Sequence, residues 1–119
     1  MAVTWTETQQ RKNMIVLKAV VTIADADSAC TWTGSGYVER IQVTWGGTTP
    51  DNSCTITLVD ANSLDASNGK LAAVDGTGDD LDFLTADLHV PVYGALTIGE
   101  TGFGTASSSA TVYIYIAQI

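Results

Sequence analysis

The sequence predicts an all-β protein, an antiparallel β-sandwich or jelly roll of about seven or eight strands. Apolar residues recur at every second position in several short segments, which is the spacing of a strand with one buried face. Gly, Ser, Asn and Asp separate these segments, as turn residues do. No long segment has the apolar spacing of an amphipathic helix, so we expect strands alone to build the core.

Residues 1–13 show no sustained period, so we expect an extended N-terminal arm, followed by a single domain of residues 14–119. Trp5 is the only large apolar group of this arm. Trp5 is either a stray aromatic on a floppy terminus or an anchor that inserts into a neighbouring subunit, because Trp is favoured at interface centres.

Two clear alternating segments follow the arm. Residues 14–26 form the first predicted strand, with these residues on one face: Ile15, Leu17, Ala19, Val21 and Ile23. After a possible short strand at 30–33, residues 37–45 place Tyr37, Ile41, Val43 and Trp45 inward and Val38, Arg40, Gln42 and Thr44 outward. Glu39 interrupts the inward face, which suits a position at the rim. Residues 53–60 alternate most cleanly, and residues 37–60 together predict an antiparallel hairpin with a long loop.

Residues 60–90 carry weaker signals. A short strand is predicted at 71–74, and residues 81–86 fit either one helical turn or a strand. Carboxylates gather between Asp75 and Asp82 among glycines, which is compatible with calcium or with an acidic solvated loop. The cluster lacks the spacing of an EF-hand, so the solvated loop is the preferred interpretation and no metal site is predicted.

The last thirty residues predict two strands joined by a small-residue loop. In the final strand Val112, Ile114 and Ile116 share the face expected in the core, and Tyr113 and Tyr115 lie on the other. Either a loop of the same chain covers these tyrosines or a second subunit does, because Tyr suits interfaces that retain some water. An exposed edge at this strand would also invite pairing between subunits.

Composition and charge limit the possible partners. The chain has 119 residues, 45% of them hydrophobic, which fits one folded domain and excludes global disorder. Its net charge is −8 and its five basic residues are scattered, so we expect no nucleic-acid partner. We expect no membrane partner either, because the first apolar run is too short to span a bilayer. No secretory signal is visible, which predicts folding in a cytosol.

We find no catalytic constellation and expect no cofactor and no enzyme activity. His89 is the only histidine and precedes Val90-Pro91, which suits a loop or surface position better than a catalytic base. Cys30 and Cys54 are most simply reduced core thiols, with a disulfide as the alternative. Three tryptophans, Trp5, Trp32 and Trp45, could stack on sugar rings, although Trp45 is in phase with the core.

The C-terminal pattern resembles that of small virion proteins encoded by many tailed bacteriophages. The matching residues are Pro91, Gly94, Leu96, Thr97, Gly102, Gly104, Thr111, Val112 and Tyr115. These proteins are β-sandwiches, and several resemble head decoration (cement) proteins. The longer acidic stretch from Asp75 to Asp87 departs from the pattern.

The resemblance implies a decoration protein that binds the outer surface of an assembled capsid. The partners would be the major capsid protein and other copies of the chain, in a homotrimer, and the location would be the virion, after synthesis in the host cytoplasm. The N-terminal arm, with Trp5, Arg11 and Lys12, would face the capsid, and Tyr113 and Tyr115 would form the contact between subunits. The alternative is a carbohydrate-binding or receptor-binding β-sandwich of a phage fibre or a secreted protein.

Overall fold

A computed structural model describes residues 3–22, 28–46, 53–71, 74–75, 81–83, 88–101 and 109–118. These residues form ten strands and no helix, so they contain no apolar helix that could cross a membrane. The strands are β1 (Thr4–Arg11), β2 (Met14–Thr22), β3 (Ser28–Ala29), β4 (Ser35–Gly46), β5 (Ser53–Val59), β6 (Val74–Asp75), β7 (Leu81–Phe83), β8 (Val90–Tyr93), β9 (Thr97–Thr101) and β10 (Ser109–Gln118). The predicted all-β fold is confirmed, with eight strands of three residues or more.

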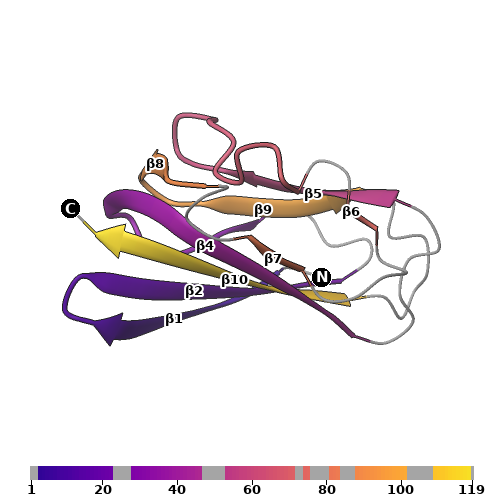
Figure 1. Cartoon of the computed structure of the whole chain (residues 1–119), viewed down its shortest axis with the longest axis horizontal. Helices are drawn as coiled ribbons and strands as arrows, with labels where there is room; N and C mark the ends of the chain where they lie inside the picture. Colours follow the sequence, from indigo (N-terminus) through magenta and orange to yellow (C-terminus); the bar gives the residue numbers. More distant parts are fainter. Residues whose placement is uncertain are drawn as a thin grey trace.

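The strands form two antiparallel sheets. The larger sheet has the order β1-β2-β10-β4-β7, and β8 pairs with β4 beside β7 on the same edge. The smaller sheet has the order β3-β9-β5-β6. In Figure 1, β5 and β9 lie above the layer formed by β1, β2 and β10, which gives the two layers of a sandwich.

Aliphatic side chains from the facing sides of both sheets fill the core. The larger sheet supplies residues that are at most 2% exposed, among them Ile15, Leu17, Val43, Val112, Ile114 and Ile116. The smaller sheet and the segment before it supply Ile56, Leu58, Leu96 and Ile98, which are equally buried. Burial of these side chains provides the main driving force for folding.

The N-terminal segment is not an arm, contrary to the sequence-based expectation of one at residues 1–13. Thr4–Arg11 form strand β1, which pairs with β2 from Thr4↔Val20 to Arg11↔Met14. In this strand Thr alternates with Trp, Glu and Gln, so the sequence lacks the alternation of apolar and polar residues from which a strand could be predicted. The sandwich therefore begins well before residue 14.

Two predicted neighbours along the chain are not neighbours in a sheet. The predicted hairpin at residues 37–60 is wrong, because β4 belongs to the larger sheet and β5 to the smaller one. The C-terminal strand is also not an edge, since β10 lies between β2 and β4. Long connections allow the chain to cross between sheets, which alternation within each strand does not reveal.

A β-bulge changes the phase of β4. Tyr115 is opposite Arg40 but Ile116 is opposite Val38, so Glu39 is an extra residue on β4. On the N-terminal side of the bulge, Val38 is fully buried and Tyr37 lies on the outer side, the reverse of the predicted orientation. Ile41 and Val43, which follow the bulge in the chain, point inward as predicted.

The weaker strand predictions have mixed outcomes. Residues 81–83 form strand β7 and no helical turn, and the strand predicted at 71–74 is the two-residue β6. The short strand predicted at 30–33 is instead β3, at Ser28–Ala29. Most of the acidic stretch from Asp75 to Asp87, and with it the calcium alternative, lies outside the described residues.

Candidate functional site

All four tyrosines of the chain project from the outer face of the larger sheet. Tyr113 and Tyr115 alternate with buried residues on β10, Tyr37 lies beyond the bulge on β4, and Tyr93 lies on β8. We call Tyr37, Tyr93, Tyr113 and Tyr115, with Lys18, Arg40 and Gln42 beside them, the tyrosine face. Among the described residues, the core contains aliphatic side chains, Cys30 and Trp32 but no tyrosine, and all four tyrosines lie on one surface.

Long side chains of neighbouring strands hold the two central rings. The Lys18 Nζ lies 5.9 Å from the centre of the Tyr113 ring, and the Arg40 Cζ lies 5.4 Å from that of Tyr115. The Tyr115 hydroxyl donates a hydrogen bond to Gln42 Oε1 at 2.7 Å. These contacts, together with the central place of β10, fix the rings on a rigid support.

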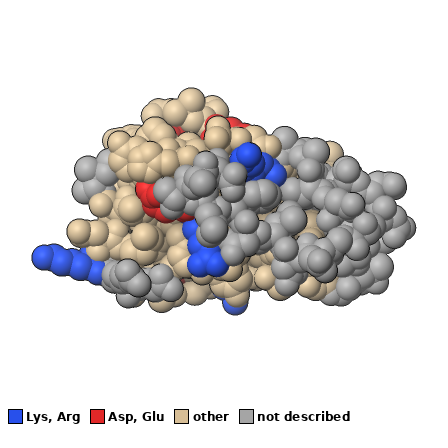
Figure 2. All heavy atoms as spheres, viewed as in Figure 1, with Lys and Arg blue, Asp and Glu red and all other residues tan. Residues whose placement is uncertain are grey.

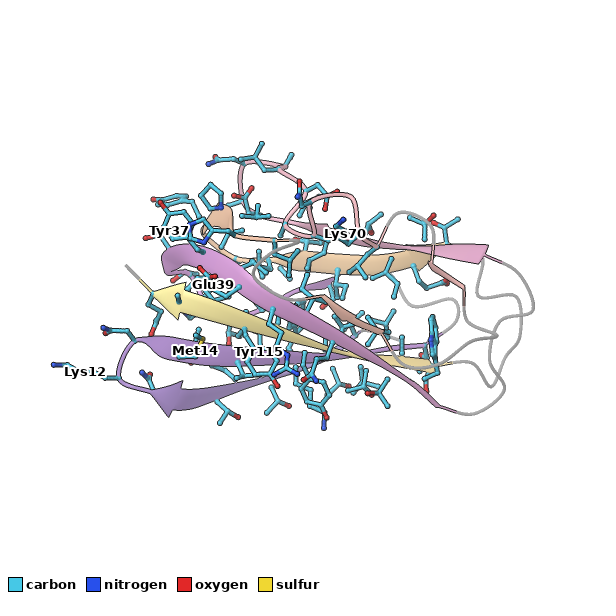
Figure 3. All side chains as sticks on the ribbon, viewed as in Figure 1. Lys12, Met14, Tyr37, Glu39, Lys70 and Tyr115 are labelled. Carbon is cyan, nitrogen blue, oxygen red and sulfur yellow. The ribbon has the colours of Figure 1, made fainter. Side chains whose placement is uncertain are left out.

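A second aromatic group lies at the end of the face beyond the bulge. The rings of Tyr37 and His89 are stacked, with centroids 4.4 Å apart and planes inclined by 5°. His89 Nδ1 lies 2.7 Å from Glu39 Oε1, so the extra residue of the bulge also orients the imidazole. In Figure 3, Tyr37 and Glu39 lie at the same end of the sheet. Tyr93 at this end is 63% exposed.

The charge around the central rings differs from that of the chain as a whole. The chain carries a net charge of −8, but Lys18 and Arg40 flank Tyr113 and Tyr115. The residues directly opposite these rings on β2 and β4 are Lys18, Val16, Gln42 and Arg40, and the nearest carboxylate on β4 is that of the bulge residue Glu39. Figure 2 shows that the described Lys and Arg atoms on the visible side are separated and form no basic patch. The tyrosine face therefore combines aromatic rings with two cations, and with one carboxylate at the bulge.

The structure separates the five predicted interface residues. Tyr113 and Tyr115 lie together on the tyrosine face. Trp5 lies on the other side of its strand, where it packs against the core and its Nε1 donates to the Ser28 carbonyl at 3.2 Å. Lys12 is exposed at the tip of the β1–β2 hairpin (Figure 3), and the side chain of Arg11 is outside the described part of the structure.

Five residues of the face were not predicted as site residues from the sequence: Tyr37, Tyr93, Lys18, Arg40 and Gln42. The bulge reverses the orientation of Tyr37, and the only hint in the sequence is the charged Glu39 within an apolar phase. Tyr93 was not recognised because the turn at Gly94 separates β8 from β9, which belong to different sheets. Arg40 and Gln42 were predicted to point outward, but their cross-strand neighbours, like those of Lys18, depend on the register.

The remaining candidate residues have structural roles where they are described. Trp32 is 7% exposed and belongs to the core, so its ring is not available for a sugar. Cys30 is a buried free thiol, as predicted, and the side chain of Cys54 lies outside the described residues. Burial raises the pKa of Cys30, although hydrogen bonds with Leu96 and Trp32 act in the opposite direction.

The acidic groups of the loop after β5 act as backbone caps. Asp60 is 4% exposed, and its carboxylate accepts hydrogen bonds from the backbone N–H groups of Asn62, Leu64 and Tyr93. Asp65 accepts bonds from Ser67 and Gly69 in the same way. Within the described residues, no three His, Cys, Asp or Glu side chains gather as metal ligands would.

No protein-family model matches this chain, and neither a curated protein nor a solved structure does.

Proposed function

We propose that the protein is a structural subunit of a bacteriophage virion, of the head decoration type, and that it binds the outer capsid surface through its tyrosine face. The placement of all four tyrosines on one face carries this proposal. Tyrosines that served only to fill the core would not all lie on the outer side of one sheet. Tyrosine is enriched at protein interfaces because a rigid apolar ring carries a polar tip.

The face suits binding because it is ordered before contact. Tyr113 and Tyr115 are held by Lys18, Arg40 and Gln42, so their association with a partner costs little side-chain entropy. The two cations favour an acidic area on the capsid protein, since charge complementarity improves both the rate and the specificity of association. The partner is therefore an acidic protein surface with room for aromatic rings.

The C-terminal pattern that resembles decoration proteins has a structural explanation in this chain. Gly94 has a φ of 78°, and a Cβ there would lie 2.5 Å from the Cβ of Ala61. Leu96 and Val112 are fully buried. The pattern thus supports a shared sandwich architecture, and the homotrimer that the resemblance implies is part of the proposal.

Sedimentation with capsids tests the proposal. Assembled shells of the major capsid protein encoded nearest to this chain's gene should carry the purified wild-type protein into the pellet. Tyr113→Ala and Arg40→Ala should each reduce the bound fraction, and added salt should weaken binding because two cations contribute. Thr57→Ala, an exposed position on the smaller sheet, is the matched control and should bind like the wild type. Equal binding by all variants would exclude the tyrosine face, and no binding by the wild type would exclude the function.

The exposed aromatic group favours carbohydrate binding as the second candidate. Tyr93 is 63% exposed beside the stacked pair of Tyr37 and His89, and such rings can stack on a sugar. A glycan array probed with the wild type and with Tyr93→Ala separates the candidates. Glycan binding that is lost in Tyr93→Ala would favour this candidate, and the absence of binding would leave the decoration proposal.

A further inference from the structure

The two edges of the larger sheet differ in how they are protected. One edge is divided between β7, with three residues, and β8, with four residues including Pro91. Short strands and proline are common ways to prevent a sheet edge from pairing with another chain. The other edge is β1, which has eight residues and contains neither Pro nor Gly. Among the described strands of the larger sheet, only β1 therefore offers an edge of more than four residues, with a regular stretch from Thr4 to Gln9.

The outer side of β1 has no partner among the described residues. β1 pairs with β2 alone, and Thr4, Thr6, Glu7 and Thr8 are exposed. In Figure 1, β1 is the outermost strand of its layer, with no other labelled strand beyond it. Trp5 fixes the strand from the inner side through its bond to Ser28. Within the described part of the chain, the backbone groups along this edge therefore have no strand beside them and can pair with a further one.

We propose that β1 pairs with β1 of a second copy of this chain, antiparallel, across a two-fold axis at Thr6. An axis at Thr6 places Thr6 opposite Thr6 of the second copy, Thr4 opposite Thr8, and Trp5 opposite Glu7. A two-fold contact requires a surface that is complementary to itself, and the segment Thr4–Thr8 meets this condition because Thr occupies its first, middle and last positions. Thr side chains directly opposite each other across antiparallel strands are a favourable pair.

Two-fold axes at neighbouring residues of β1 would give less favourable contacts between the two copies. An axis at Glu7 would put two carboxylates directly opposite each other, which is unfavourable. An axis at Thr8 would extend the pairing into the irregularity between Gln9 and Arg11. An axis at Trp5 would place Glu7 opposite Val3, which is 5% exposed and belongs to the core. The register at Thr6 avoids all three conflicts.

The charge distribution allows two acidic chains to approach at this edge. The exposed carboxylate of β1, Glu7, lies opposite an indole ring in the proposed register and not opposite its own copy. On the outer face, the neighbour of Thr6 on β2 is Lys18 and that of Thr8 is Val16, so no described carboxylate adjoins the contact there. The pairing would join the tyrosine faces of two copies into one continuous surface. It is independent of capsid binding and would add a two-fold contact to any trimer.

Cysteine cross-linking tests the register directly. Residues opposite each other in an antiparallel pair have Cα atoms about 4.5–5.5 Å apart, within reach of a disulfide. Thr6→Cys should therefore form a covalent dimer under mild oxidation. Thr4→Cys and Thr8→Cys are matched controls, because two copies of either residue would lie about 13 Å apart along the strands. A mixture of these two single variants should cross-link, since position 4 lies opposite position 8.

The readout is the dimer band on a non-reducing gel, with the wild type as the control for Cys30 and Cys54. We expect cross-linking of Thr6→Cys, and of the mixture, to be about tenfold faster than that of Thr4→Cys or Thr8→Cys alone. Equal rates for all variants would overturn the pairing, and a faster rate for Thr8→Cys alone would overturn the register.

Sedimentation velocity of proteins without an added cysteine provides a second measurement. Thr6→Lys places two ammonium groups opposite each other and should shift the wild type toward assemblies of half the mass, because it disrupts the two-fold contact. Thr57→Lys adds the same charge on the smaller sheet and should not shift it. A wild type that remains monomeric at high protein concentration would also overturn the proposal.

Discussion

The two faces of strand β10 have different roles, because one face fills the core and the other contributes the central rings of the tyrosine face. Ile114 points into the core and is fully buried, whereas Tyr113 points outward and is only partly buried against Lys18. The inner face is aliphatic and dry, and the outer face is aromatic with polar tips. Substitutions on β10 can therefore change the stability of the fold and the binding surface separately, because neighbouring residues of the strand belong alternately to the core and to the tyrosine face.

Ile114→Ala should produce the largest effect on stability. Removal of a fully buried aliphatic side chain leaves a cavity and costs about 2–5 kcal/mol in the free energy of unfolding. Tyr113→Ala, its neighbour on the other face, should cost clearly less and instead reduce capsid binding. Urea denaturation of both variants measures the difference. Equal losses would show that the tyrosine face is itself part of the core.

Asp60→Ala should have the next largest effect. Its carboxylate satisfies three buried or partly buried backbone N–H groups, one of them on Tyr93, and the loss of such an acceptor costs about 1–3 kcal/mol. Because Tyr93 belongs to the tyrosine face, the variant should also increase amide hydrogen exchange in β8. Unchanged exchange at Tyr93 would show that this end of the face is held without Asp60.

Tyr115→Phe separates the ring from its hydroxyl. The variant removes the hydrogen bond to Gln42 and should cost about 0.5–1.5 kcal/mol of stability. Tyr93→Phe is the control at an exposed ring, with an expected change within about 0.5 kcal/mol. Thermal melts compare the two. A larger loss in Tyr93→Phe would contradict the assignment of Tyr115 as the better-held ring.

The smallest effect concerns pH and the thiol on the inner side. Burial raises the pKa of Cys30 above the ordinary value of 9.0, so the folded protein keeps this proton to a higher pH than the unfolded chain. The contribution of the thiol to stability is complete below about pH 9 and declines as the pH rises toward the folded pKa. Melting temperatures between pH 7 and 10 should therefore decline less in Cys30→Ala than in the wild type. Parallel curves would show that the thiol is exposed to water.

Alternation in the sequence predicted the all-β class, the inner face of β2 and both faces of β10. These predictions succeed because a strand in a two-layer protein must alternate, whatever its neighbours. β1 was not predicted, since its outer positions are Thr and its inner ones are mostly polar. The partners of β4 and β5 were also beyond the sequence, because pairing between distant strands depends on how the whole chain packs.

The site was only half predictable for the same reason. Tyr113 and Tyr115 follow from the period of one strand, but their association with Tyr37 and Tyr93 requires the register of β4 with β10 and β8. Trp5 was assigned to an interface because its segment was expected to lie outside the domain. Once β1 joins the sheet, the same residue packs inside.

The bulge at Glu39 keeps the two halves of β4 in one phase although the strand contains an extra residue. Arg40 and Tyr37 both lie on the outer face, and Ile41 and Val38 both point inward, because Glu39 is left out of the pairing with β10. Loss of Glu39 alone would therefore remove the bulge and leave Tyr37 outside. A β4 that took up Glu39 in regular alternation would instead turn Tyr37 into the core and Val38 toward solvent. The outward position of Tyr37 thus depends on a local irregularity of the backbone and not on its own side chain.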